Sequence, residues 1–132
     1  MPAVNSSNSS PHSYDYAYIR VVPRVERGEF ANVGVILFCR TRRFLGMRFA
    51  IDEGTLRAID PQLDMSAVLQ QLDMLKQMCK GEGPIGVLGV AEVFHWVVAP
   101  HSTVIQCSPV HSGLCSDPEV ALERLVEKMR GE

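Results

Sequence analysis

YDYAYIRVVPRVERGEFANVGVILFCRTRRFLGMRFAI, residues 14–51, has the pattern of three consecutive β-strands. The first predicted strand, 14–22, is rich in aromatic and β-branched residues, and Pro23 closes it because proline cannot donate to a strand ladder. The second, 33–40, is a continuous apolar run typical of a central strand, and the third covers 44–51. The short connections between them predict a three-stranded meander.

After residue 51 the apolar pattern changes to a helical period. Asp64 is a capping residue that precedes an amphipathic stripe, which predicts a helix from Asp64 to Lys80. Asp117 followed by Pro118 predicts a last helix that ends at Arg130. Shorter patterns predict a helix over 53–59, a fourth strand over 103–107, a flexible linker over 81–89 and a structured loop over 108–116. The pattern over 90–99 fits a helix or a strand, and we prefer a short helix that Pro100 ends.

These elements predict one α+β domain over residues 14–132. Its antiparallel sheet has about four strands, the three-stranded meander first, with two main helices packed on it. Residues 1–13 form a polar tail that offers little to bury, and we expect it to be disordered. With 132 residues, 46% of them hydrophobic, the chain is long enough to build a core.

The compartment is predicted from what the sequence lacks. Its apolar runs are too short to cross a bilayer, and its first residues do not have the pattern of a signal peptide. We therefore expect a cytoplasmic protein without a membrane partner. In the cytoplasm cysteines are mostly reduced, so we expect free thiols at Cys39, Cys79, Cys107 and Cys115.

Charge is distributed unevenly along the chain. Residues 14–51 hold seven arginines and three acidic residues, a balance of +4, whereas residues 52–132 hold six basic and twelve acidic residues, a balance of −6. A basic half can bind an anionic partner such as a nucleic acid, but two oppositely charged halves can also attract each other within the fold. The arginines alternate between strand faces instead of gathering on one helix, which argues against the nucleic-acid interpretation.

A first polar cluster surrounds the connection between the first two predicted strands. Its arginines and asparagine could bind an anionic ligand, because guanidinium groups match carboxylate and phosphate. The alternative, which we prefer, is a hairpin connection in which Glu29 pairs with an arginine and Asn32 caps its own turn. The cluster consists of Arg20, Arg24, Glu26, Arg27, Glu29 and Asn32.

A second polar cluster follows the predicted fourth strand. Cys107, His111 and Cys115 could bind zinc, with Cys79 or His101 as a fourth ligand, although their three-residue gaps are not the usual spacing of such ligands. The remaining members of the cluster are Ser102, Thr103, Gln106, Asp117 and the nearby His95.

A thiol nucleophile is a second interpretation of this cluster. Cys115 precedes a helix N-terminus, whose dipole would favour the thiolate, and His111 could act as its base. The interpretation we prefer is a structured loop fixed by proline, glycine and hydrogen bonds, so we assign no catalytic residue, metal ligand or cofactor. Thr103, Gln106, His111 and Cys115 nevertheless stay candidate ligand-binding residues, because polar loops often carry sites.

Four motifs resemble one known family over nearly the whole chain. They are YDYAYIRVVPR (14–24), ERGEFANVGVILF (26–38), RFLG (43–46) and HWVVAPHSTVIQCSPVHSGLCSDP (95–118). In sequence and order they resemble the bacterial family known as domain of unknown function 3037. The resemblance implies a small cytoplasmic protein with no established activity. It also implies a protein partner, because members of that family are often encoded near HipA-like kinases.

From these observations we predict a non-enzymatic binding or accessory protein that acts through a protein partner, with a HipA-like kinase as the named candidate. Two alternatives stay open: an enzyme that uses metal-assisted hydrolysis or the thiol of Cys115 with His111, and a nucleic-acid-binding module that uses the arginines of the first half. We also predict that the two polar clusters lie close together, with Arg20 and Asn32 facing Gln106 or His111.

Overall fold

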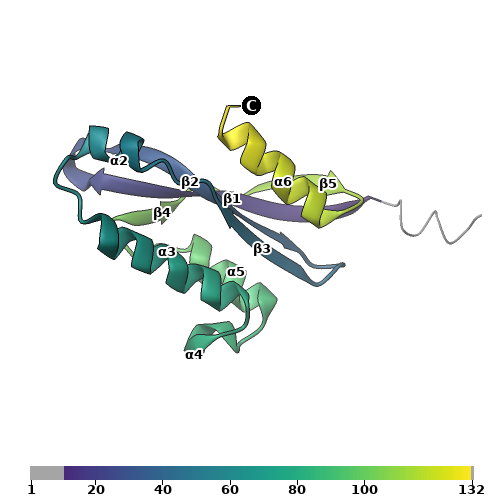
Figure 1. Cartoon of the computed structure of the whole chain (residues 1–132). Coiled ribbons are helices and arrows are strands. Elements are labelled where there is room, and N and C mark those ends of the chain that lie inside the picture. The colour runs from purple at the N-terminus through teal and green to yellow at the C-terminus, as the bar shows by residue number, and fades with distance from the viewer. Residues whose placement is uncertain (1–10, 132) are drawn as a thin grey trace, which may run out of the picture.

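A computed structural model describes residues 11–131, and within that range the chain forms one five-stranded antiparallel sheet flanked by helices (Figure 1). The strands lie in the order β3-β2-β1-β4, and β5 pairs with β1 alongside β4. Their bounds are β1 (His12–Arg24), β2 (Glu29–Cys39), β3 (Phe44–Phe49), β4 (Ile105–Cys107) and β5 (His111–Cys115). The α+β fold and the meander at its start are therefore confirmed.

The meander is built around β1 and β2, the two longest strands. A short 3-10 helix, η1 (Val25–Arg27), and Gly28 in the left-handed conformation connect them. The register shifts between Ile19 and Arg20, because Val33 is an extra residue of β2 between Asn32 and Gly34 and forms a bulge. Gly34 is also needed for space, because an added Cβ would lie 2.8 Å from the carbonyl oxygen of Arg48.

Helices cover both faces of the sheet. Figure 1 shows α3 and α5 on one face and α6 on the other. Aspartate side chains cap three of the helices: Asp52, Asp64 and Asp117 accept a hydrogen bond from a backbone N–H in the first turn of α2, α3 and α6. The caps at Asp64 and Asp117 were predicted, and the one at Asp52 was not. The helices are α2 (Glu53–Ile59), α3 (Met65–Cys79), α4 (Gly83–Gly86), α5 (Val90–Val98) and α6 (Pro118–Met129).

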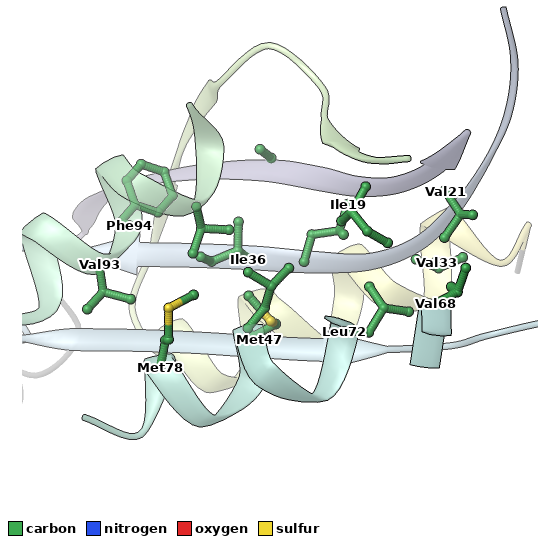
Figure 2. Packing of buried hydrophobic residues seen from close by; sticks show 14 of the residues in the cluster. Ile19, Val21, Val33, Ile36, Met47, Val68, Leu72, Met78, Val93 and Phe94 are labelled. Carbon is green, nitrogen blue, oxygen red and sulfur yellow. The ribbon is translucent and has the colours of Figure 1, made fainter. Parts of the chain in front are cut away.

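Each face of the sheet has its own core, because β1 and β2 are apolar on both sides. The larger core joins α2, α3 and α5 to the sheet, and Figure 2 shows Leu72 and Met78 of α3 pointing toward Ile36 and Met47. The smaller core lies under α6, where Leu122 and Leu125 pack with alternate residues of β2. Burial on both faces agrees with the central strand that the apolar run at 33–40 predicts.

Several details differ from the sequence prediction. Pro23, which was predicted to close the first strand, lies inside β1, and β2 begins at Glu29 instead of residue 33. His12 and Ser13, which were assigned to the tail, are the first residues of β1, whereas the rest of that tail, 1–10, lies outside the described residues. The predicted loop over 108–116 contains a fifth strand, β5, that pairs with the start of β1. The predicted linker over 81–89 contains the single turn of α4. No helix within residues 11–131 is long and apolar enough to span a membrane.

Candidate binding surface on the sheet

One face of the sheet is only half covered. Helix α6 packs mainly on β2 and β3, so on the same face the side chains of β1, β4 and β5 are covered by this helix only in part or not at all. We call this surface the open face. It consists of Tyr16, Tyr18, Arg20, Phe30, Asn32, Gln106 and His111.

Arg20 lies at the centre of the open face and is held from several sides. Its Nε donates to Asn32 Oδ1 at 3.3 Å, and its guanidinium carbon lies 4.2 Å from the centre of the Phe30 ring. Gln106 is the residue opposite Arg20 in the pairing of β1 with β4. Phe30 is 46% exposed, which is unusual for a phenylalanine and leaves its free face available for contact.

A row of aromatic rings continues the open face along β1. The ring centres of Tyr16 and Tyr18 lie 5.9 Å apart, edge to face, and that of His111 lies 5.5 Å from Tyr16. Partial burial beside α6 raises the pKa of the Tyr18 hydroxyl, so this group stays protonated and able to donate a hydrogen bond at neutral pH. The open face is therefore aromatic and hydrogen-bonding, with a single permanent charge at Arg20.

The two predicted polar clusters do come together, through Arg20, Asn32 and Gln106. Three other members of the first cluster have structural partners: Arg24 lies 4.0 Å from the Asp60 carboxylate, and Arg27 lies 3.0 Å from that of Glu29. The preferred interpretation was right about the Glu29 pair. It was wrong about Asn32, which lies within β2 and accepts its hydrogen bond from Arg20 instead of capping a turn.

The second cluster is divided between the faces of the sheet. Cys107 faces the larger core and its thiol donates to the Val97 carbonyl at 3.5 Å, whereas His111 pairs with Tyr16 and lies on the open face. Within residues 11–131 no group of three candidate metal ligands comes together. Thr103 contributes only its carbonyl oxygen, which accepts a hydrogen bond from Gln106 Nε2 at 2.7 Å.

The thiolate at Cys115, which the alternative interpretation requires, is disfavoured. Burial, followed by the neighbouring Cys39 and Asp117, raises the pKa of the Cys115 thiol, and these effects oppose the helix dipole and the nearby Arg42. His111 and Cys115 are four residues apart in β5 and pair with different residues of β1, Tyr16 and His12. The geometry therefore does not hold the predicted pair, the Cys115 thiol and the His111 imidazole, together as nucleophile and base.

A cleft adjoins the open face at Asn32. It has a volume of about 660 Å³ and lies between the start of β2, the start of α2 and the end of α6. Asp52 and Glu53 line it, and the backbone N–H of Thr55 is the main cause that lowers the pKa of the Asp52 carboxyl. The surroundings of the open face are thus acidic as well as basic.

Sequence reasoning missed the contribution of Phe30 and of the tyrosine row to this surface. The signal was present, because Tyr16, Tyr18 and Arg20 alternate along β1 and must share one face of the sheet. What the sequence could not show is that α6 stops short of this part of the face.

Comparison with known proteins places the chain in a family. Residues 16–129 match the family model described as "Protein of unknown function (DUF3037)". The chain belongs to the DUF3037 family. The match runs from β1 to the last residue of α6, so every residue of the open face lies inside the DUF3037 domain. No curated protein and no solved structure matched the chain, and the family description assigns no activity.

Proposed function

We propose that this DUF3037 protein is a non-enzymatic binding module that holds a protein partner on the open face. The observation that carries the proposal is the arrangement of Arg20 between Asn32 and the half-exposed ring of Phe30. Aromatic residues and arginine are the side chains enriched at the energetic centres of protein interfaces. Here they lie side by side on a rigid sheet.

Preorganisation supports the same proposal. A free arginine side chain loses conformational entropy when a partner fixes it, at about 0.5–1.5 kcal/mol for each such side chain. Arg20 is already fixed by its hydrogen bond to Asn32 and its contact with Phe30. A partner that bound this surface would therefore order little that is not ordered beforehand.

Charge favours a protein over a nucleic acid. Binding to a phosphate backbone needs several free cations, and the affinity depends on how many phosphates they neutralise. The open face has one arginine, its neighbours Arg24 and Arg27 are paired with carboxylates, and Asp52 and Glu53 line the adjoining cleft. Arg130 also lines the cleft, but the two carboxylates leave its lining with a net negative charge, which would repel phosphate groups.

The first partner to test is a HipA-like kinase in the cytoplasm of a bacterium, as the family resemblance suggests. The surface of the kinase would contact the aromatic row and Arg20. This chain would contribute no catalytic residue to the kinase. Other protein partners are compatible with the same surface.

Affinity capture from the source organism tests the proposal, with the Arg20→Ala, Phe30→Ala double variant as the probe of the open face. The matched control is the Arg124→Ala, Val120→Ala double variant, which removes one arginine and one exposed apolar side chain from α6. We expect the wild-type chain and the control to retain the same protein partner and the open-face variant to lose it. An identical partner set for all three, or captured nucleic acid that salt displaces, would contradict the proposal.

A further inference from the structure

β3 leaves one side of its backbone without a neighbouring strand. The Ala50 N–H donates to the Val33 carbonyl of β2 at 2.8 Å. Because successive residues of a strand direct their backbone groups to opposite sides, Phe44, Gly46 and Arg48 also bond to β2. Leu45, Met47 and Phe49 therefore direct their N–H and C=O groups outward, where no strand of residues 11–131 pairs with them.

A groove runs along this outer side. It has a volume of about 210 Å³ and is lined by five consecutive residues of β3, 44–48, together with Lys76, Cys79 and Lys80 of α3 and Glu119 and Leu122 of α6. Consecutive residues of a strand belong to both faces of the sheet. A groove lined by all five, between helices on opposite faces, must therefore follow the edge of the strand.

The groove carries free positive charge. Lys76 and Lys80 form no ion pair with any carboxylate in residues 11–131. The carboxylates on the α6 side are already occupied, because Arg48 lies 2.7 Å from Glu119 and 3.2 Å from Glu123. A second copy of the chain, paired through its own β3, would bring lysines against lysines, which disfavours self-association at this edge.

The opposite edge of the sheet is built differently. There β4 and β5 are short and are separated by Ser108, Pro109 and Val110, and proline in an edge strand discourages further pairing. By contrast, the pairing of β3 with β2 is regular from Phe44 to Phe49. Of the two edges, only β3 offers an uninterrupted strand for pairing.

We propose that β3 accepts an extended segment of a protein partner as a sixth strand, and that this segment carries acidic side chains. The outward backbone groups of Leu45, Met47 and Phe49 would supply the hydrogen bonds, and Lys76 and Lys80 would select for carboxylates. An adjoining groove of about 500 Å³ is lined by Leu45, Cys79 and exposed Val87. Apolar residues on the same face as the acidic ones would be accommodated there, whereas the residues between the acidic ones would face Leu122 of α6.

The probe is a blocked peptide of alternating valine and glutamate, titrated into the full chain, with a valine–lysine peptide of the same length as its counterpart. We expect the acidic peptide to slow hydrogen exchange at the amides of Leu45, Met47 and Phe49, and the lysine peptide to leave them unchanged. No binding, or protection only at β4 and β5, would overturn the proposal. So would protection that increases with protein concentration without peptide, because the occupant would then be a second copy.

Charge reversal provides the second measurement, and it does not disturb the core because both lysines are exposed. We expect Lys76→Glu with Lys80→Glu to weaken the acidic peptide about tenfold or more and to admit the lysine peptide. The control is Lys128→Glu on α6, which lies on the β5 side of that helix and should change neither affinity. Equal affinity of the acidic peptide for the wild-type chain, the double variant and the control would contradict the proposal that Lys76 and Lys80 select for carboxylates. The Arg20→Ala, Phe30→Ala variant should bind the peptide normally, which separates this edge from the open face.

Discussion

The guanidinium of Arg20 contacts the Phe30 ring and the Asn32 side chain. By contrast, Arg24, Arg27 and Arg48 form ion pairs with carboxylates. A cation over an aromatic ring at an exposed site is worth about 0.5–1 kcal/mol. Removing it should leave the fold intact. Truncating a residue at the centre of an interface commonly costs about 2 kcal/mol or more in binding. We therefore expect Arg20→Ala to lose the protein partner while its free energy of unfolding stays close to that of the wild-type chain.

The thiols are expected to be inert in the folded protein. Burial raises the pKa of Cys79 to about 12 and that of Cys107 to about 11. Since the thiolate is the reactive form, we expect iodoacetamide at about pH 8 to modify both residues far more slowly than in urea, where a thiol titrates near about 8.5. Mass spectrometry of the alkylated peptides measures the two rates.

The same shifts predict how stability depends on pH. A raised pKa in the folded state means that the neutral thiol is favoured by folding. Its contribution is fully present below the unfolded pKa of about 8.5 and is lost as the pH rises towards the folded values. A Cys79→Ala, Cys107→Ala variant should therefore lose less stability in alkali than the wild-type chain. Urea denaturation at several alkaline pH values measures this difference, and an equal loss of stability in both proteins would contradict the prediction. Equal alkylation rates in the folded and unfolded chains would contradict the prediction that the two thiols are inert.

At the scale of elements, Ser108 joins β4 to β5. Its backbone N–H donates to the Tyr18 carbonyl, and its Oγ accepts from the Tyr18 N–H at 2.9 Å. The Ser108 side chain thus replaces a backbone acceptor at the point where the pairing of β1 is interrupted between β4 and β5. Ser108 is 4% exposed, so water cannot easily take its place.

We therefore expect Ser108→Ala to leave the Tyr18 N–H without an acceptor and to lower the free energy of unfolding by about 1–3 kcal/mol. Ser112→Ala is the matched control in the same edge, because the Ser112 hydroxyl donates to Asp15 Oδ1 at an exposed site. It should cost well under about 1 kcal/mol. Urea denaturation compares the two variants, and equal losses would show that the Ser108 hydroxyl has no special role.

The sequence predicts some elements much better than others. Helices α3 and α6 were predicted almost residue by residue, because Asp64, Asp117 and Pro118 are local start signals. β5 was missed because HSGLC has little strand propensity. It pairs with β1 through tertiary context: the Tyr14 ring lies over Gly113, where an added Cβ would lie 2.6 Å from ring atom Cζ. No local pattern reveals such a contact.

At the scale of the whole molecule, the uneven charge of the chain is explained partly by the fold. Arg24 pairs with Asp60, and Arg48 pairs with Glu119 and Glu123, so basic residues of the first half meet acidic residues of the second. Attraction between the two halves was one of the two explanations that the sequence allowed. It could not be selected from the sequence, because these ion pairs depend on how α2 and α6 pack on the sheet.

The candidate site was also only partly predictable. Arg20, Asn32 and Gln106 were expected to meet, and they do so because β1 pairs with both β2 and β4. That Phe30 would be exposed beside them depends on where α6 stops. The coverage of a sheet by a helix is a property of the packed molecule, so the extent of the open face could only come from the structure.

The proposal that the open face binds a protein is tested most directly by photo-crosslinking in cells of the source organism. The crosslinking residue is p-benzoylphenylalanine, which retains an aromatic ring, introduced in place of Phe30. The control carries it in place of Val120 of α6; the native side chains at these positions are 46% and 41% exposed. We predict a discrete protein adduct from position 30 and none from position 120. Adducts to nucleic acid, equal adducts from both positions, or no adduct from position 30 would contradict the proposal.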